Sequence, residues 1–352
     1  MKRIIVYVSD HGYGHAARTI GLLRQFKLDD EIIVKNSNAF NFIKKSLPEI
    51  KVIHSQTDVG PISNLFSENS DSEKTFNLYS NWIKNEKKWI ANEINYFKNK
   101  KIDLVISDIS PMGIRFAKKL GIPSITIANF TWIDILNKLP YHKNKENIIE
   151  WLTESYEKVD LGIKLPLSMD LIGLKKIKKA SLLYRSVTLS NDKLLKKLNL
   201  RTKPITIYLG NHNKPKIKIT NNGSKSNIIE ILSNDLKINN KIFNYSTEAQ
   251  NIISASNLVI AKPGYSILSE CINSRCPILL IPRKNYPEDH TLCEQSKQLG
   301  IGTILKINPR DPVIKLEKFN LLELKNNIND NKIKKLYDYP KASDIIQEFL
   351  NA

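Results

Sequence analysis

The chain has 352 residues, of which 41% are hydrophobic, and its 54 Lys and Arg residues exceed its 35 Asp and Glu residues by a formal net charge of +19. This length exceeds what one hydrophobic core usually supports, and the hydrophobic content is ample for two packed domains. The first apolar run, residues 4–8, is too short for a signal peptide or a membrane span. We therefore expect a two-domain cytoplasmic protein.

The excess of lysine has two interpretations. One is a solvated lysine-rich surface, and the other is attraction to an anionic acceptor or peripheral contact with the inner face of an anionic membrane. Because the chain has no helix-turn-helix, RRM, KH or zinc-finger pattern, we expect no nucleic-acid partner. No Asp-x-Asp pair ends a strand, and the three cysteines lack the spacing of zinc ligands, so we expect no metal and no other cofactor.

Short apolar runs alternate with helical stretches in the first half of the chain. Strands are expected at residues 4–8, 32–34, 52–53, 104–106 and 124–128. Helices are expected at residues 16–26, 38–47, 73–100 and 111–120. Continuous apolar runs indicate strands that are buried on both faces, as in a parallel sheet covered by crossover helices. Residues 1–165 are therefore predicted to form one Rossmann-like domain.

The alternation stops over residues 166–204, which we interpret as a linker. It resumes over residues 205–340, which are predicted to form a second Rossmann-like domain, although residues 216–241 are dense in Asn and Lys and are expected to be loops. Residues 341–352 have the spacing of an amphipathic helix that packs back on the domain junction. The expected fold class is α/β, with two doubly wound parallel-sheet domains facing a central cleft.

Two glycine-bearing turns, residues 9–18 and residues 261–270, each join an apolar strand to a helix. Backbone N–H groups and the helix dipole favour a phosphate or another negatively charged oxygen at such a turn. The sequence therefore predicts one such site in each domain.

The first turn also satisfies the glycine pattern of a dinucleotide site through Gly12, Gly14 and Ala17. Such a site expects an acidic residue after the second strand, to hold the ribose. Here strand 32–34 is followed by Lys35, which argues against a dinucleotide.

Two histidines distinguish the first turn. His15 falls in the first turn of the expected helix, where a neutral imidazole can take a proton from a sugar or lipid hydroxyl. Asp108 ends another strand at the same sheet edge and can fix the tautomer of that imidazole. The alternatives are that His11 and His15 only hydrogen-bond their own loop and that Asp108 is a helix N-cap.

The second turn has features that suit a diphosphate. Gly264 allows close approach of a ligand to the backbone, and Ser266 offers a hydroxyl at the start of the helix. Glu270 lies one turn later on the same face, where its carboxylate can accept both hydroxyls of a ribose. The alternative for Glu270 is a surface or capping role.

Together these motifs resemble the GT-B glycosyltransferases, the group that includes the MurG-type transferase and the UDP-glycosyltransferases. The resemblance lies in His-Gly-Tyr-Gly-His at 11–15 and Lys-Pro-Gly-Tyr-Ser at 262–266. With Ile-Ser-Asp-Ile-Ser-Pro at 106–111 and Asn-Phe-Thr-Trp at 129–132, the pair is most similar to the glycosyltransferase-like domain that precedes the sugar kinase in L-arabinokinases, and to its free-standing bacterial relatives.

The resemblance implies a transferase of the hexosyltransferase type. It would move a sugar from a nucleotide-sugar, expected to be a UDP-sugar, to an acceptor hydroxyl by inverting, metal-independent displacement, with His15 as base and Asp108 as its partner. The implied acceptor-side residues are His11, Gly12, Tyr13, Gly14 and Arg18. The implied donor-binding residues are Gly210, Asn211, Lys262, Gly264, Tyr265, Ser266, Glu270, Asp289 and His290. The acceptor could be a glycan, a lipid-linked molecule or another anionic molecule.

Two other functions stay open on the same architecture. A sugar-nucleotide epimerase would place acid and base groups around the donor sugar. A non-catalytic sensor or scaffold would bind the nucleotide-sugar without turnover, which would suit a domain known from fusions with kinases.

Overall fold

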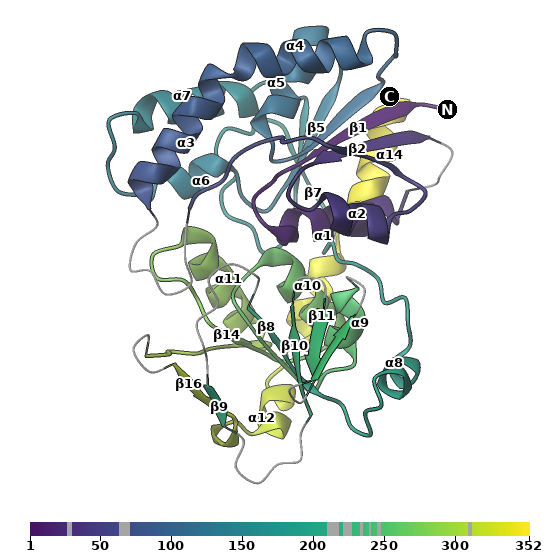
Figure 1. The fold of residues 1–352 in the computed structure, drawn as a ribbon, viewed down its shortest axis with the longest axis vertical. Helices are drawn as coiled ribbons and strands as arrows, with labels where there is room; N and C mark the ends of the chain where they lie inside the picture. The colour runs from purple at the N-terminus through teal and green to yellow at the C-terminus, as the bar shows by residue number, and fades with distance from the viewer. Residues whose placement is uncertain are drawn as a thin grey trace. The chain divides into compact units, whose positions relative to one another are not determined.

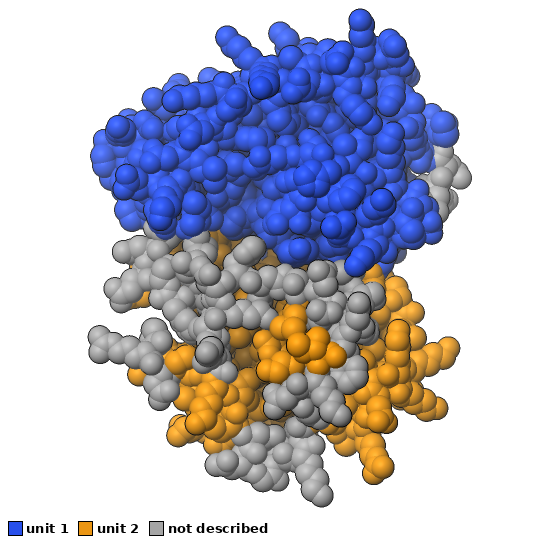
Figure 2. Space-filling view, viewed as in Figure 1, with its two compact units in different colours: residues 1–63, 69–183, 336–352 blue, residues 64–68, 184–335 orange. Residues whose placement is uncertain are grey.

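The computed structural model describes residues 1–26, 30–62, 71–209, 218–220, 227–232, 235–238, 241–244, 248–308 and 312–352 (Figure 1). These residues form two compact units. Unit 1 comprises the described residues of 1–63, 69–183 and 336–352, and unit 2 comprises those of 184–335 (Figure 2).

Unit 1 is a seven-stranded, wholly parallel sheet with the order β3-β2-β1-β4-β5-β6-β7. Its strands are β1 (Arg3–Val8), β2 (Glu31–Asn36), β3 (Lys51–His54), β4 (Leu104–Asp108), β5 (Ser124–Ala128), β6 (Leu161–Lys164) and β7 (Ile177–Lys179). Its helices are α1 (Tyr13–Leu23), α2 (Phe40–Ser46), α3 (Ser72–Lys84), α4 (Glu86–Phe97), α5 (Pro111–Leu120), α6 (Trp132–Leu136), α7 (Lys145–Tyr156) and α14 (Ala342–Asn351). The apolar runs of β1, β2, β4 and β5 are buried strands, as the sequence predicts, whereas the short run in β3 is only partly buried at the edge of the sheet.

The two faces of this sheet are covered by different helices. Tyr7 of β1 packs with Phe97 of α4 and Phe116 of α5 on one face. Helices α1, α2 and α14 lie on the other face (Figure 1). Helix α14 contacts α1, and its Ile345 and Ile346 are buried.

Unit 2 has a second seven-stranded sheet with the order β12-β11-β10-β8-β13-β14-β15. The strands of this unit are β8 (Ile205–Tyr208), β9 (Lys218–Thr220), β10 (Ile228–Ile231), β11 (Asp235–Ile238), β12 (Lys241–Asn244), β13 (Leu258–Ala261), β14 (Ile278–Leu280), β15 (Gly302–Ile304) and β16 (Val313–Lys315). Its helices are α8 (Asn191–Lys197), α9 (Ala249–Ser254), α10 (Tyr265–Ser274), α11 (Pro287–Gln298), α12 (Leu321–Asn326), α13 (Asp330–Lys334) and the 3-10 turn η1 (Leu316–Lys318). A further 3-10 turn, η2 (Lys335–Tyr337), precedes α14.

The segments expected to lack regular structure contain strands and a helix. The prediction that residues 216–241 form loops was wrong. Strand β10 pairs with β8, and the antiparallel strands β11 and β12 extend the sheet beyond β10. These strands are short and carry polar residues between apolar ones, so they give no continuous apolar run. The stretch 166–204 contains β7, which joins the sheet of unit 1, and α8, which belongs to unit 2. The sequence of β7 is polar and its residues are exposed.

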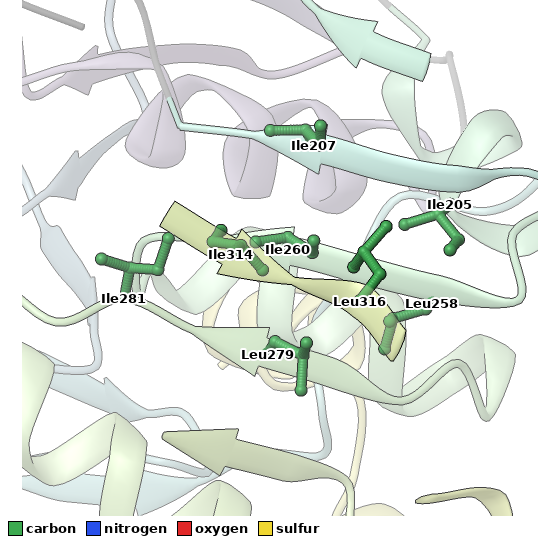
Figure 3. Packing of buried hydrophobic residues seen from close by; sticks show 8 residues of the cluster. All are labelled: Ile205, Ile207, Leu258, Ile260, Leu279, Ile281, Ile314 and Leu316. Atoms are coloured by element: carbon green, nitrogen blue, oxygen red, sulfur yellow. The ribbon is translucent and has the colours of Figure 1, made fainter. Parts of the chain in front are cut away.

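The core of unit 2 follows the alternation of strand side chains. Alternate residues of β8 and β13, together with Leu279 and Ile281, point to one face and pack against Ile314 and Leu316 (Figure 3). Leu194 of α8 and Ile252 of α9 belong to a separate cluster with β10 and β11. Strand β13 is buried and lies between β8 and β14, so the turn after Ala261 follows the carboxyl end of an interior strand of the sheet.

Candidate functional site

The first glycine turn lies at the carboxyl ends of two adjacent strands. Val8 of β1 is in register with Asp108 of β4, and the Ser9 N–H donates to the Asp108 carbonyl at 3.2 Å. Gly12 precedes α1 with φ of 75°, a left-handed conformation that favours glycine. This turn brings His15, in the first turn of α1, to the end of β4.

His15 and Asp108 are in direct contact and nearly buried. His15 Nδ1 lies 2.7 Å from Asp108 Oδ1, and their side chains are 7% and 4% exposed. Arg18, one turn further along α1, donates from Nε to Asp108 Oδ2 at 2.7 Å, and its Nη1 donates to Asn129 Oδ1. The structure therefore brings together both residues of the predicted catalytic pair and adds a buried guanidinium behind the carboxylate.

The contact with Asp108 fixes the tautomer of the His15 ring. Burial raises the pKa of Asp108, but the positive charge of Arg18 and the contact with His15 outweigh it, so the pKa falls below its usual value. Arg18 Nη2 also lies 3.0 Å from Nδ1, but the shorter contact, 2.7 Å to an ionised carboxylate oxygen, requires a proton on the nitrogen, so we assign Nδ1 as the donor to Asp108. In the neutral ring, Nε2 then carries the lone pair and can accept a proton.

A second carboxylate ties together three turns at the same edge of the sheet. Asp10 accepts hydrogen bonds from the N–H groups of Ser37, Asn38 and Thr57 at 2.7, 2.9 and 2.7 Å. These residues follow β2 and β3. The turns around His15 are thereby joined into one framework.

Asp58 was missed by the sequence analysis, because it lies in an irregular loop with no recognisable signature. It accepts from the Asp10 N–H at 2.7 Å and from the Trp132 indole N–H at 3.0 Å. Burial and the neighbouring Asp10 charge raise the pKa of Asp58 to about 7. The Trp132 ring lies 5.3 Å from the His11 ring and 6.0 Å from the His15 ring, between centroids. Asp58 therefore fixes the position of the Trp132 ring, which lies beside both histidines.

The remaining acceptor-side residues occupy different surroundings. The Tyr13 ring packs edge-on against Phe42, with 5.5 Å between centroids. A Cβ on Gly14 would meet no atom of the described chain within 4 Å, so α1 is open at that position. Arg18 is 2% exposed, which places it behind Asp108 and away from the surface.

The second glycine turn connects β13 to α10. Gly264 is extended, and α10 begins at Tyr265, so the first N–H groups of the helix follow the turn directly. No hydrogen bond or ion pair joins Lys262 to any described residue. Burial and the nearby Arg283 charge lower the pKa of Lys262. A partly buried cation in the turn that leads into a helix favours an anionic ligand. Ser266 is largely buried one residue into the helix.

The two acidic residues of the predicted donor site are each bound by an arginine. Arg185 donates to Glu270 from Nε at 2.7 Å and from Nη2 at 3.2 Å. Arg283 donates to Asp289 from Nε at 3.0 Å and from Nη2 at 2.6 Å. The His290 side chain is exposed. Sequence reasoning missed both arginines, and Gly210 and Asn211 lie outside the described residues.

The structure also bears on the cysteines, on metal binding and on membrane-spanning helices. The three cysteines are free and buried. Among the described residues, no group of three or more His, Cys, Asp or Glu side chains is arranged to hold a metal ion. None of the described helices combines the length and apolarity needed to cross a membrane.

Two family models match separate parts of the chain. Residues 2–156 match the model described as Glycosyl transferase family 1, and residues 179–299 match the one described as Glycosyltransferase family 28 C-terminal domain. The L-arabinokinase of Arabidopsis thaliana is 22% identical over 80% of this chain and 28% of that protein. An uncharacterized glycosyltransferase of Methanopyrus kandleri is 38% identical over 16% of this chain and 17% of that protein. The chain thus spans less than a third of either curated relative.

Solved glycosyltransferases share the fold over the whole chain. A Streptomyces enzyme complexed with thymidine diphosphate has a TM-score of 0.60 at 13% identity, covering 100% of both chains. The spinosyn forosaminyltransferase has a TM-score of 0.62 at 12% identity, again covering 100% of both chains. A Phytolacca americana enzyme complexed with UDP-2-fluoro-glucose and pterostilbene has a TM-score of 0.59 at 10% identity, covering 100% of this chain and 99% of that one. The two family matches identify residues 2–156 and 179–299 as glycosyltransferase domains, and the solved structures show that the whole chain has the fold of GT-B glycosyltransferases.

Proposed function

We propose that this glycosyltransferase moves a sugar from a UDP-sugar to an acceptor hydroxyl with inversion at the anomeric carbon, and that His15 is the general base. The observation that carries the proposal is the 2.7 Å contact between His15 Nδ1 and Asp108. It orients the ring and leaves Nε2 as the proton acceptor.

In the proposed step, Nε2 of His15 takes the proton of the acceptor hydroxyl while the hydroxyl oxygen attacks the anomeric carbon. The bond from that carbon to the diphosphate oxygen breaks, and the nucleoside diphosphate leaves with the electron pair. Asp108 stabilises the imidazolium that forms. The Arg18 guanidinium keeps Asp108 ionised, so that the carboxylate does not take the proton itself.

The donor half of the proposal rests on unit 2. Lys262 and the first N–H groups of α10 would offset the negative charge of the departing diphosphate. In this scheme the transfer needs no metal ion. The ligands bound in two of the similar structures, thymidine diphosphate and UDP-2-fluoro-glucose, support a nucleoside diphosphate as the bound group.

The test is incubation with UDP-, GDP- and TDP-sugars, with and without EDTA. We expect slow release of UDP that EDTA does not prevent, and, once an acceptor is found, a product of inverted anomeric configuration by NMR. Interconversion of the sugars would instead identify an epimerase. Tight binding without release of nucleotide would identify a sensor or scaffold.

A further inference from the structure

We infer that Arg185 is a positioning residue for the donor ribose, because it holds the Glu270 carboxylate in the orientation and charge state that ribose hydroxyls require. This inference rests on the proposed function, since it needs a nucleoside diphosphate in unit 2. It assigns a role to Arg185, which belongs to neither glycine turn.

The geometry of the pair restricts the carboxylate. The Nε and Nη2 atoms of Arg185 reach different oxygens of Glu270, at 2.7 and 3.2 Å. A two-point contact with a planar guanidinium fixes both the position and the plane of a carboxylate. A carboxylate offers about four acceptor sites, and the guanidinium uses two of them.

The burial of the pair makes the arginine necessary. The side chains of Arg185 and Glu270 are only 4% and 3% exposed. Burial by itself lowers the pKa of Arg185, but Glu270, together with Glu248 and Tyr208, raises it above its usual value. Without this cation, a carboxylate in so dry a site would tend to take up a proton, and it would then lose acceptor capacity toward hydroxyl groups.

The position of Glu270 on α10 agrees with this role. It follows Ser266 by four residues, about 6 Å along the helix axis. One nucleoside diphosphate can therefore place its phosphates at the N-terminus of α10 and its ribose at Glu270. Arg185 lies 85 residues before Glu270 in the chain, so it supports the carboxylate from outside the helix.

The test compares UDP with 2′,3′-dideoxy-UDP by calorimetry, in wild type and in the variants Arg185→Lys and Arg185→Gln. Because hydrogen bonds to a charged group are worth about 1.5–3 kcal/mol, we expect wild type to prefer UDP by about ten- to hundredfold. Both variants should reduce this preference to about threefold or less, by weakening UDP binding while the affinity for the dideoxy compound stays the same. The same comparison is made with TDP and 3′-deoxy-TDP.

A matched control is Arg275→Lys, the same change in an exposed ion pair with Asp330 at the far end of α10. It should keep the full preference for UDP. Circular dichroism and thermal melting confirm that each variant is folded.

Four results would overturn the inference. Equal affinity of wild type for UDP and 2′,3′-dideoxy-UDP would do so whether or not the variants fold. Equal weakening of both ligands in Arg185→Lys would show a general structural or phosphate role. An undiminished preference in that variant would also contradict it. If wild type binds neither UDP nor TDP, the proposed function fails together with the inference. If wild type binds UDP but one of the other results is found, only the inference about Arg185 fails.

Discussion

His15 and Arg18 lie one turn apart on α1, and both bind the same carboxylate, that of Asp108. The imidazole and the guanidinium thus share one buried counter-charge. Because a guanidinium has no lone pair to accept a proton and an imidazole nitrogen has one, the two residues have different roles in the proposed reaction.

Replacing the proposed base should separate chemistry from binding. We expect His15→Asn to lower the rate of transfer by about 10²- to 10⁴-fold, because general base catalysis contributes about that much. Donor affinity should stay within about twofold of wild type, since His15 is not a donor ligand in the proposal. Steady-state kinetics and UDP calorimetry measure both quantities. His54→Asn, at an exposed histidine in β3, is the control, and a parallel loss of donor affinity in His15→Asn would contradict the division of roles.

Asp108→Asn should reduce stability as well as activity. It leaves the buried Arg18 without its counter-charge, and breaking a buried pair in this way costs about 3–5 kcal/mol in the free energy of unfolding. Because the pKa of Asp108 is lowered in the folded state, its stabilising contribution is present above the unfolded pKa and disappears as the pH falls through the folded value. Urea unfolding should therefore show the largest difference from wild type near neutral pH and a smaller one in acid. A difference that does not change with pH would be inconsistent with this account.

Asp58 should show the opposite pH dependence. Its pKa rises from 3.8 to about 7 on folding, so its favourable contribution is present below the unfolded pKa and is lost as the pH rises toward 7. Asp58→Asn removes this titration. The free energy of unfolding of the variant minus that of wild type should therefore increase between pH 4 and pH 8, as measured by urea unfolding. A constant difference over this range would show that Asp58 does not titrate there.

Lys262→Gln should weaken donor binding. The variant removes a partly buried cation from the start of α10, and we expect an increase of about tenfold or more in the dissociation constant for UDP, since a charged hydrogen bond is worth about 1.5–3 kcal/mol. Lys297→Gln, at an exposed lysine of α11, should bind UDP as wild type does. Unchanged binding in Lys262→Gln would remove this lysine from the donor site.

The sequence predicted the features that depend on local patterns. Buried strands such as β1 and β13 show as continuous apolar runs, and the glycine turns mark where these two strands join helices. The meeting of His15 and Asp108 follows from the rule that parallel strands end at one edge, because Val8 and Asp108 are register partners. These are short-range signals combined with one topological rule.

Contacts between distant residues gave no such signal. Arg185 reaches Glu270 across 85 residues, and Trp132 reaches Asp58 across 74. Neither pair has a spacing that sequence periodicity can identify. The strands β10 and β11 were missed because each has only four residues and mixes apolar with polar side chains. Such a short pattern cannot be distinguished from a loop.

The return of residues 336–352 to unit 1 means that this unit is not one continuous stretch of chain. A fragment that ended at residue 183 would expose the surface of α1 that α14 covers, and it would forgo the burial of Ile345 and Ile346, worth about 1.5–3 kcal/mol each. The helix that bears His15 would then expose apolar side chains to water. Dissection of this enzyme into separately expressed halves should therefore supply the last helix, fused or in trans, to the N-terminal half.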